Sequence, residues 1–297
     1  MKLEHMQTEQ RNNDTMQLDA MSVREALEAM NKEDQTVATE VQKTIPEIEA
    51  LVVKAIKRLK TGGRLIYMGA GTSGRLGVLD AAECPPTFGV PPERVIGLIA
   101  GGGSAFTEAV EGAEDSKLYG KKDLAAIDLT ANDTVIGIAA SGRTPYVIGG
   151  LAYAREVGAL TASISCNHDA PMSQHADIAI EMNTGPEVLT GSTRLKAGTA
   201  QKLILNMIST TIMVGLGKVF QNLMVDFMAT NEKLQARGRH IIAQATGLSL
   251  EEADVYHQKA NGQVKVAIVM ILADASYDEA VTRLESSDGI VRKAIAQ

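Results

Sequence analysis

Residues 64–74, RLIYMGAGTSG, join a short apolar run to a glycine-rich turn. Gly69, Gly71 and Gly74 have the G-x-G-x-x-G spacing found where a buried strand turns into a helix at a phosphate-binding site. A helical pattern follows the turn. The stretch therefore predicts the first strand–turn–helix unit of an α/β sheet, and the rest of the sequence decides which ligand the turn takes.

Four more apolar runs of similar length follow the first. They are rich in Ile and Val and show no polar alternation, which is typical of strands buried on both faces of a sheet. The runs are RVIGLIA at 94–100, DTVIGIAA at 133–140, ALTASIS at 159–165 and DIAIEM at 177–182. Because helical segments separate them, we predict a doubly wound, mainly parallel α/β sheet sandwiched by helices.

Helical patterns precede the sheet. Ser22-Val-Arg-Glu25 is a capping box that opens a short helix. Apolar residues then recur at spacings of three and four from Val37 to Leu59, and Pro46 either kinks this helix or restarts it. The first part of the chain is therefore expected to be a helical arm.

Helical patterns also follow the sheet. The strand signal disappears after about residue 218, and two capping boxes, Ser249–Glu252 and Ser276–Glu279, open short helices. The expected domains are an N-terminal helical arm at 1–44, an α/β domain at 45–218, whose ligand is considered below, and a small all-helical domain at 219–297.

Charge and hydropathy limit the class of partner. The chain has 297 residues and a formal charge of -7, whereas attraction to nucleic acid needs clustered Lys and Arg. The one basic cluster, Lys54–Lys60, is most simply the solvated face of an amphipathic helix. No apolar run approaches the roughly 20 residues of a membrane helix, and no signal peptide is evident. We expect a cytoplasmic protein without a nucleic-acid or membrane partner.

The cysteines and histidines suggest no metal. Cys84 and Cys166 lack a paired C-x-x-C spacing, and the five histidines form no H-x-x-x-H or H-E-x-x-H set. We interpret both thiols as structural and expect no metal site.

The glycine turn lacks a second feature that NAD sites have. In an NAD site the second strand ends in an acidic residue that binds the ribose, but here it runs into Gly101-Gly102-Gly103. Thr72 and Ser73 add hydroxyl donors at the start of a helix, where backbone N–H groups also bind anions. This combination favours a phosphate monoester over a dinucleotide.

A second turn supports the same interpretation. Ser141-Gly-Arg-Thr-Pro145 follows the run at 133–140, with Pro placed to begin a helix. Each turn alone is weak evidence for a binding site, since Gly and Ser occur in most turns. Two hydroxyl-rich turns at one sheet edge, however, suit a sugar phosphate. The candidate binding residues in the two turns are Gly71, Thr72, Ser73, Ser141, Arg143 and Thr144.

The motifs GAGTSG and SGRTP resemble those of the sugar isomerase (SIS) domain. GPEVLTGSTRLKAGTAQ, at 185–201, closely resembles the signature shared by N-acetylmuramic acid 6-phosphate etherases and the glucokinase regulatory protein. LDAAECPPTFGV at 79–90 and AVEGAEDS at 109–116 resemble the etherase branch in particular. The similarity covers nearly the whole chain.

This resemblance implies an activity and two catalytic carboxylates. The family removes the D-lactyl ether from C3 of N-acetylmuramic acid 6-phosphate without a cofactor. Carried over by motif, Glu83 is the candidate acid toward the ether oxygen and Glu114 the candidate base toward C2. From spacing alone the acidic residues of this region are more simply solvated surface charges. They are Asp80, Glu83, Glu111, Glu114 and Asp115.

The signature offers further anion-binding groups. Ser192 and Thr193 precede a helix expected to begin near Arg194, and Arg194 and Lys196 carry positive charge toward a phosphate or the lactyl carboxylate. Equally, Arg194 could form a structural ion pair with Glu187. The candidate binding residues here are Glu187, Ser192, Thr193, Arg194 and Lys196.

Other functional classes stay open at this point. A sugar-phosphate-sensing regulator shares the signature, but its family has two such domains and lacks the ECPP acid. An aldose–ketose phosphate isomerase fits the fold alone. A DNA-binding repressor would need a basic helix-turn-helix, which residues 1–44 lack. SIS domains commonly pair, so the resemblance implies a homodimer.

Overall fold

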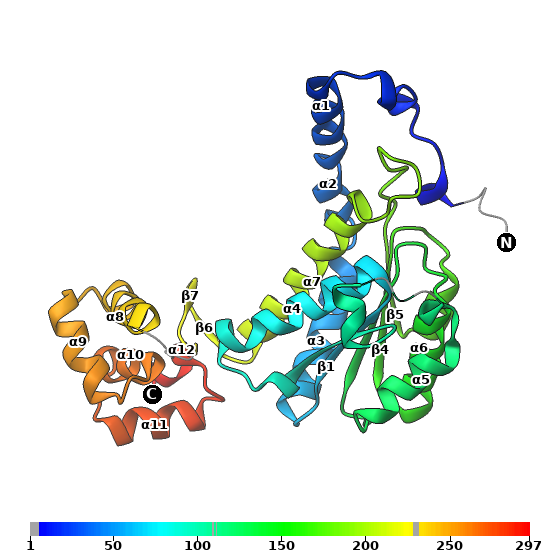
Figure 1. Cartoon of the computed structure of the whole chain (residues 1–297). Helices are drawn as coiled ribbons and strands as arrows, with labels where there is room; N and C mark the ends of the chain where they lie inside the picture. The colour runs from blue at the N-terminus through cyan, green and yellow to red at the C-terminus, as the bar shows by residue number, and fades with distance from the viewer. Residues whose placement is uncertain (1–5, 109, 111, 228–231) are drawn as a thin grey trace. The chain divides into compact units, whose positions relative to one another are not determined.

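The computed structural model describes residues 6–108, 110, 112–227 and 232–297 (Figure 1). The chain divides into two compact units. The α/β unit is Met1–Ala82 with Glu93–Ser209, and the C-terminal unit is Glu83–Pro92 with Thr210–Gln297. The domain bounds expected from the sequence stay a prediction.

The α/β unit contains a five-stranded, all-parallel sheet. Each of the five apolar runs forms one strand, which confirms the predicted fold class. The strands are β1 (Leu65–Gly69), β2 (Val95–Ile99), β3 (Thr134–Ile138), β4 (Leu160–Ser165) and β5 (Ile178–Glu181). Their order is β2-β1-β3-β4-β5, so β2 is added on one side of β1 and β3 to β5 on the other, which makes a topological switch point between β1 and β3. Ligands of open parallel sheets bind at such a switch point, beyond the carboxyl ends of the strands.

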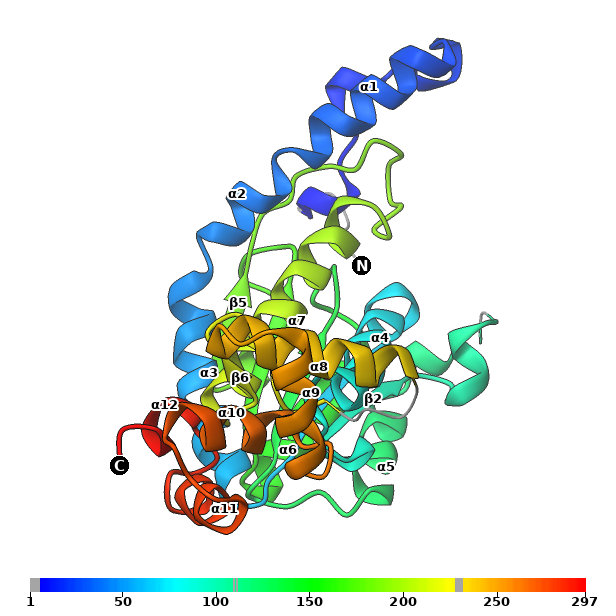
Figure 2. The same ribbon diagram turned by 90° about the vertical axis from the view of Figure 1, so that its left-hand side faces the viewer.

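Helices cover both faces of the sheet. Met68 of β1 points toward α6 (Pro145–Val157), where Gly150 leaves room for its thioether, and α5 (Lys117–Ala126) packs beside α6. Tyr67 points to the opposite face, where its hydroxyl donates to Asp80 of α4 (Gly71–Phe88) at 2.9 Å. Figure 2 shows α3 (Ile45–Lys60) and α5 on opposite sides of the strands.

The N-terminal arm is helical. Three 3₁₀ turns, Gln7–Glu9, Asn13–Thr15 and Leu18–Ala20, lead to α1 (Val23–Asp34), α2 (Val37–Gln42) and α3. The capping box of Ser22 and Glu25 is present. Pro46 lies in the first turn of α3, so it restarts the helix, because a proline there loses no intrahelical hydrogen bond.

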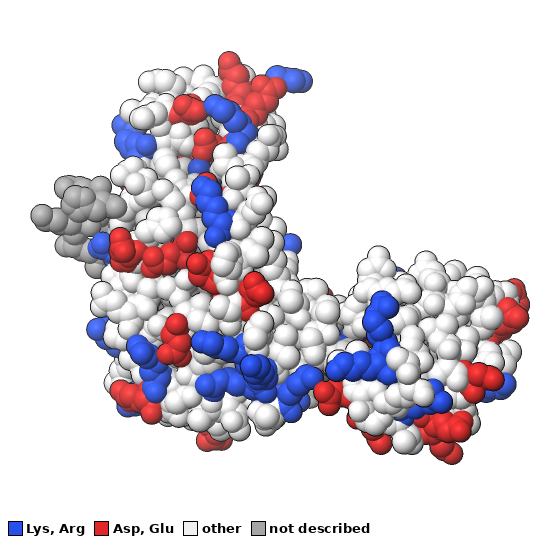
Figure 3. Space-filling view, turned by 180° about the vertical axis from the view of Figure 1, so that it is seen from behind, with Lys and Arg blue, Asp and Glu red and all other residues white. Residues whose placement is uncertain are grey.

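The basic cluster lies on the solvated face of α3. Leu51, Ala55 and Leu59 are buried, whereas Lys54 and Lys57 are exposed. Figure 3 shows basic side chains gathered on this face of the α/β unit. The interpretation of the cluster as an amphipathic face is confirmed.

The C-terminal unit is mainly helical, as predicted. Its helices are α8 (Glu232–Thr246), α9 (Leu250–Lys259), α10 (Val264–Leu272), α11 (Tyr277–Ser286) and α12 (Val291–Ala294), preceded by the last turns of α7 (Lys196–Gly215), from Thr210 on. Both predicted capping boxes are present. A hairpin of β6 (Val219–Phe220) and β7 (Leu223–Met224) was not anticipated, because strands of two residues carry no periodicity.

Short 3₁₀ turns complete the described elements. They are Pro92–Arg94, Gly103–Phe106, Ala113–Asp115 and Pro171–His175.

Candidate active site

The glycine turn closes tightly onto the sheet edge. Gly71, with φ +52°, begins α4 directly after β1. A side chain on Gly69 would lie 2.8 Å from the backbone nitrogen of Gly74, so this approach requires glycine. The first N–H groups of α4, from Gly71 to Ser73, have no intrahelical acceptor and are suited to bind an anion.

The hydroxyl of Ser73 points away from this open helix end. Ser73 is buried, and its Oγ donates to Oε1 of Gln201 on α7 at 2.9 Å. Gln201 is 1% exposed, and among the described residues its Nε2 has no hydrogen-bond partner. Sequence reasoning missed Gln201, which ends the signature but has no local pattern that indicates a polar core contact.

Asp80 joins the same helix pair. It is buried, and its Oδ1 accepts from Nδ2 of Asn206 at 2.7 Å and from Oγ of Ser209 at 3.2 Å. Together with the bond from Tyr67, these contacts tie α4 to the sheet and to α7. Asp80 is therefore not the solvated charge that its spacing suggested.

One cavity of about 220 Å³ lies at the open end of α4. Gly71, Arg75 and Glu114 line it, and Arg75 is held by a hydrogen bond from its Nε to the carbonyl of Phe106 at 2.8 Å. Glu114 is exposed. The structure thus brings the candidate base to the start of α4. Glu111 lies outside the described residues.

A second cavity of about 370 Å³ lies at the carboxyl ends of β3 to β5. Ser141 and Arg143 line it together with His168 and Asn183. The hydroxyl oxygen of Ser141 accepts the backbone N–H of Arg143 at 3.3 Å, which orders the turn before α6. Thr144 is the residue before α6 and is half-buried. Ser141 and Arg143 therefore face one hollow, as a phosphate subsite requires.

Glu83 lies elsewhere on α4. It is exposed and follows Gly71 by 12 residues, which places it about 18 Å along the helix axis from the glycine turn. The neighbouring Cys84 is buried, but the apolar setting does not bury the Glu83 carboxylate. The structure does not bring Glu83 to the turn at the start of its own helix.

The carboxylate of Glu187 in the signature segment is hydrogen-bonded within the chain. Glu187 is fully buried, and its carboxylate accepts the backbone N–H groups of Lys196 at 2.9 Å and Ala197 at 3.0 Å. Burial raises the pKa of Glu187, although these hydrogen bonds oppose the shift. Its oxygens thus cap α7 rather than pair with Arg194.

The remaining signature residues differ in exposure. The Lys196 ammonium is 3% exposed and pairs with Glu33 of α1. Ser192 and Thr193 are half-buried and Arg194 is exposed, so these three reach the surface. The ligand-binding roles expected for all signature residues stay a prediction.

Both cysteines lie in the described part of the chain. Cys84 and Cys166 are both buried, and burial raises the pKa of Cys166 to about 12. Outside the gaps at 1–5, 109, 111 and 228–231, no group of three His, Cys, Asp or Glu side chains is arranged to hold a metal ion. The described helices include none that is long and apolar enough to cross a membrane.

Comparison with known proteins identifies the family. Residues 47–155 match the glucokinase regulatory protein N-terminal SIS domain, and residues 117–210 match the SIS domain. A solved phosphoheptose isomerase from Neisseria gonorrhoeae is 19% identical, with a TM-score of 0.49 over 64% of this chain and 98% of its own.

Full-length relatives are much closer. The N-acetylmuramic acid 6-phosphate etherase of an Exiguobacterium species is 64% identical, and N-acetylmuramic acid 6-phosphate etherase 2 of Lactiplantibacillus plantarum is 62% identical. Each alignment covers 99% of this chain and 100% of the relative. The chain therefore belongs to the N-acetylmuramic acid 6-phosphate etherase family.

Proposed function

We propose that this protein is a carbon–oxygen lyase that cleaves the D-lactyl ether of N-acetylmuramic acid 6-phosphate. The products are N-acetylglucosamine 6-phosphate and D-lactate, so the reaction belongs to amino sugar catabolism and cell-wall recycling in the cytoplasm. The observation that carries the proposal is the 64% identity over 99% of the chain. The motifs GAGTSG, ECPP and SGRTP, on which the activity depends, are intact.

Phosphate binding is supported by the two cavities at the sheet edge. Arg143 supplies a positive charge and Ser141 a hydroxyl donor in the same cavity, and the half-buried Thr144 follows them in sequence. The open N–H groups at Gly71 to Ser73 offer hydrogen bonds to the sugar or its phosphate. Signature residues Ser192, Thr193 and Arg194 reach the surface and are available to the lactyl carboxylate.

The chemistry needs a base, an acid and a stabilised enolate. In the open-chain sugar the C1 aldehyde acidifies the C2 proton, which Glu114 removes. The electron pair of the C2–H bond forms the enolate, and its collapse breaks the bond from C3 to oxygen while Glu83 protonates the departing lactate. Water then adds to C3 of the unsaturated aldehyde and a proton returns to C2. Each step conserves atoms and electrons without a cofactor.

The separation of Glu83 from the glycine turn suggests that two copies of the chain form the active site. A hexose phosphate is shorter than the roughly 18 Å that separates Glu83 from the glycine turn along α4. We therefore infer that the protein is a homodimer whose sites lie near the subunit boundary, with Glu83 of one copy serving the site that holds Glu114 of the other. A cyclic dimer would form two such sites by symmetry.

Release of D-lactate from N-acetylmuramic acid 6-phosphate tests the activity directly. Purified protein that binds the substrate but releases no lactate would instead support a sugar-phosphate sensor. Interconversion of sugar phosphates without lactate would support an isomerase.

Complementation between inactive variants tests the shared site. Glu83→Gln and Glu114→Gln chains are mixed after denaturation and refolded together. If the two carboxylates act across the boundary, half of the dimers regain one intact site, and activity returns to about a quarter of the wild-type value. If both act within one chain, every mixed site lacks one group and activity does not return.

A further inference from the structure

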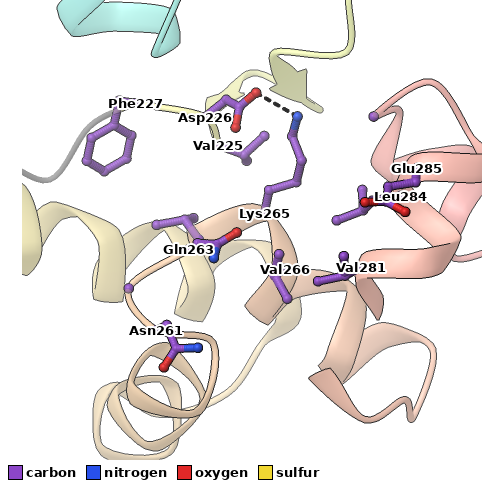
Figure 4. A pocket seen from close by; sticks show the side chains of 13 residues that line it. Val225, Asp226, Phe227, Asn261, Gln263, Lys265, Val266, Val281, Leu284 and Glu285 are labelled. Atoms are coloured by element: carbon purple, nitrogen blue, oxygen red, sulfur yellow. Dashed lines mark hydrogen bonds and ion pairs between the residues drawn. The ribbon is translucent and has the colours of Figure 1, made fainter. Parts of the chain in front are cut away.

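The C-terminal unit contains a cavity of about 590 Å³ that the proposed reaction does not use. Small-molecule sites usually enclose roughly 300–1,000 Å³. The cavity lies between the segment after β7, the start of α10 and α11 (Figure 4). Val225, Val266 and Leu284 give it an apolar wall, and each of these side chains is mostly buried.

Two charged groups, Asp226 and Lys265, line the cavity together, and Lys218 contacts Asp226 from outside the lining. Oδ2 of Asp226 accepts from Nζ of Lys265 at 2.7 Å and from Nζ of Lys218 at 2.8 Å. Figure 4 shows Lys265 reaching from the start of α10 to Asp226. Because two ammonium groups share one carboxylate oxygen, the cluster carries one positive charge in excess.

Lys265 is buried and can donate further hydrogen bonds to a ligand. It is 9% exposed, and within the described residues its only polar partner is Asp226, so two of its three N–H donors are unused. Burial lowers the pKa of Lys265, Asp226 opposes this shift, and the repulsion of Lys218 adds to it. Glu285 also borders the cavity, but it is exposed and lies beyond ion-pair distance of Lys265.

We propose that this cavity binds a small organic monocarboxylate. The ligand carboxylate accepts hydrogen bonds from Nζ of Lys265, and its aliphatic body lies against Val225, Val266 and Leu284. One negative charge matches the single excess positive charge. A phosphate monoester carries nearly two negative charges, and the second would be desolvated beside Asp226 without a partner.

Calorimetric titration of the full-length protein tests the proposal with three probes. Hexanoate supplies the carboxylate and the aliphatic body, hexanamide removes the charge, and D-lactate keeps the charge but has almost no apolar body. Hexanoate should bind at least tenfold more tightly than hexanamide, because the amide oxygen still accepts a hydrogen bond from Lys265 but lacks the negative charge that strengthens it. It should also bind more tightly than D-lactate, because only hexanoate covers the apolar wall.

Lysine variants identify the binding group. Lys265→Met keeps most of the length of the side chain and leaves Asp226 paired with Lys218, so the unit should stay folded. It should weaken hexanoate binding by about 10–100-fold and hexanamide binding much less, because the amide loses only a hydrogen bond without charge pairing. Lys218→Met should cause a smaller loss, since it removes the excess charge but not the contact. The matched control is Lys293→Met, an exposed lysine of α12 that does not line the cavity.

The outcomes separate this proposal from the etherase reaction. Lactate release from the sugar phosphate should be the same in Lys265→Met as in the wild type. Melting temperatures measured for each variant distinguish lost binding from lost folding. Equal affinity for hexanoate and hexanamide, undetectable hexanoate binding at millimolar concentration, or unchanged hexanoate binding in folded Lys265→Met would each overturn the proposal.

Discussion

The carboxyl edge of the sheet and the signature segment at 185–201, which runs into α7, both contain polar motifs, but the side chains of the two regions have different partners. At the sheet edge, Glu114, Ser141 and Arg143 line cavities. In the signature, Glu187 and Lys196 are buried and already bonded within the chain. Because a polar group that is saturated internally has little left to offer a ligand, the sheet edge is the better candidate for substrate contact, and Glu187 and Lys196 of the signature are better candidates for scaffold.

Glu114→Gln should produce the largest effect. The amide cannot accept the C2 proton, so lactate release should fall by about 10²–10⁴-fold, together with solvent deuterium exchange at C2. Glu83→Gln should also lose lactate release but keep exchange, because the base still works. Mass spectrometry of substrate recovered from deuterium oxide measures both effects.

Asp115→Asn is the control for Glu114. Its carboxylate is exposed and adjacent in sequence, so its loss should leave both readouts near the wild-type values. Exchange that survives in Glu114→Gln but disappears in Glu83→Gln would mean that the acid and base roles are reversed.

The sequence predicts the sheet well and the hydrogen-bonded interior poorly. The strands are predictable because each apolar run, such as the one ending at Gly69, indicates burial on both faces by itself. The hydrogen bond of the Ser73 hydroxyl is not predictable in this way, because its acceptor, Gln201, lies 128 residues away in the sequence. The same limit applies to Lys196, whose partner Glu33 is on the arm. Local patterns identify polar groups but not the distant groups that satisfy them.

Ser141→Ala and Ser73→Ala sharpen the distinction within the predicted site. Ser141 lines a cavity, so loss of its hydroxyl should raise KM for the sugar phosphate about tenfold or more. Ser73 donates to Gln201, so Ser73→Ala should lower the free energy of unfolding by about 1–3 kcal/mol and change KM less. Steady-state kinetics and urea unfolding of both variants provide the comparison.

The reverse order would revise the assignment of these turns. A larger rise of KM in Ser73→Ala would indicate that its hydroxyl turns outward when the ligand binds, with Gln201 following it. Unchanged KM in both variants would remove both hydroxyls from the site.

Glu187→Gln tests the scaffold role of the signature. One carboxylate oxygen becomes an NH₂ group that faces a backbone N–H of α7, so the free energy of unfolding should fall by about 1–3 kcal/mol. KM should change little. Urea unfolding measures the loss, and Glu251→Gln, an exposed residue of α9, is the control. A large rise of KM with unchanged stability would instead place Glu187 in contact with the ligand.

Replacement of His257 should give the smallest effect, which is a change in the pH dependence of unfolding. It tests whether a buried polar atom without a hydrogen-bond partner can result from packing alone, outside any binding site. The ring of His257 is 8% exposed, and among the described residues Nε2 has no partner. A side chain on Gly238 of α8 would lie 3.2 Å from Nε2, so helix packing leaves no room for a ligand there. The atom is thus buried by packing alone.

The pH dependence of unfolding follows from this burial. Burial lowers the pKa of His257, Asp254 opposes the shift and Arg239 adds to it, so the folded protein binds this proton less readily than the unfolded chain. The contribution to stability is fully present above the unfolded pKa of about 6.5 and is lost as pH falls below it. Urea midpoints from pH 7.5 to 5.5 should therefore fall more steeply in the wild type than in His257→Gln. The exposed His240, replaced by Gln, should keep the wild-type slope. Equal slopes in wild type and His257→Gln would show that the ring is solvated, and that its orphan nitrogen is not a cost of packing.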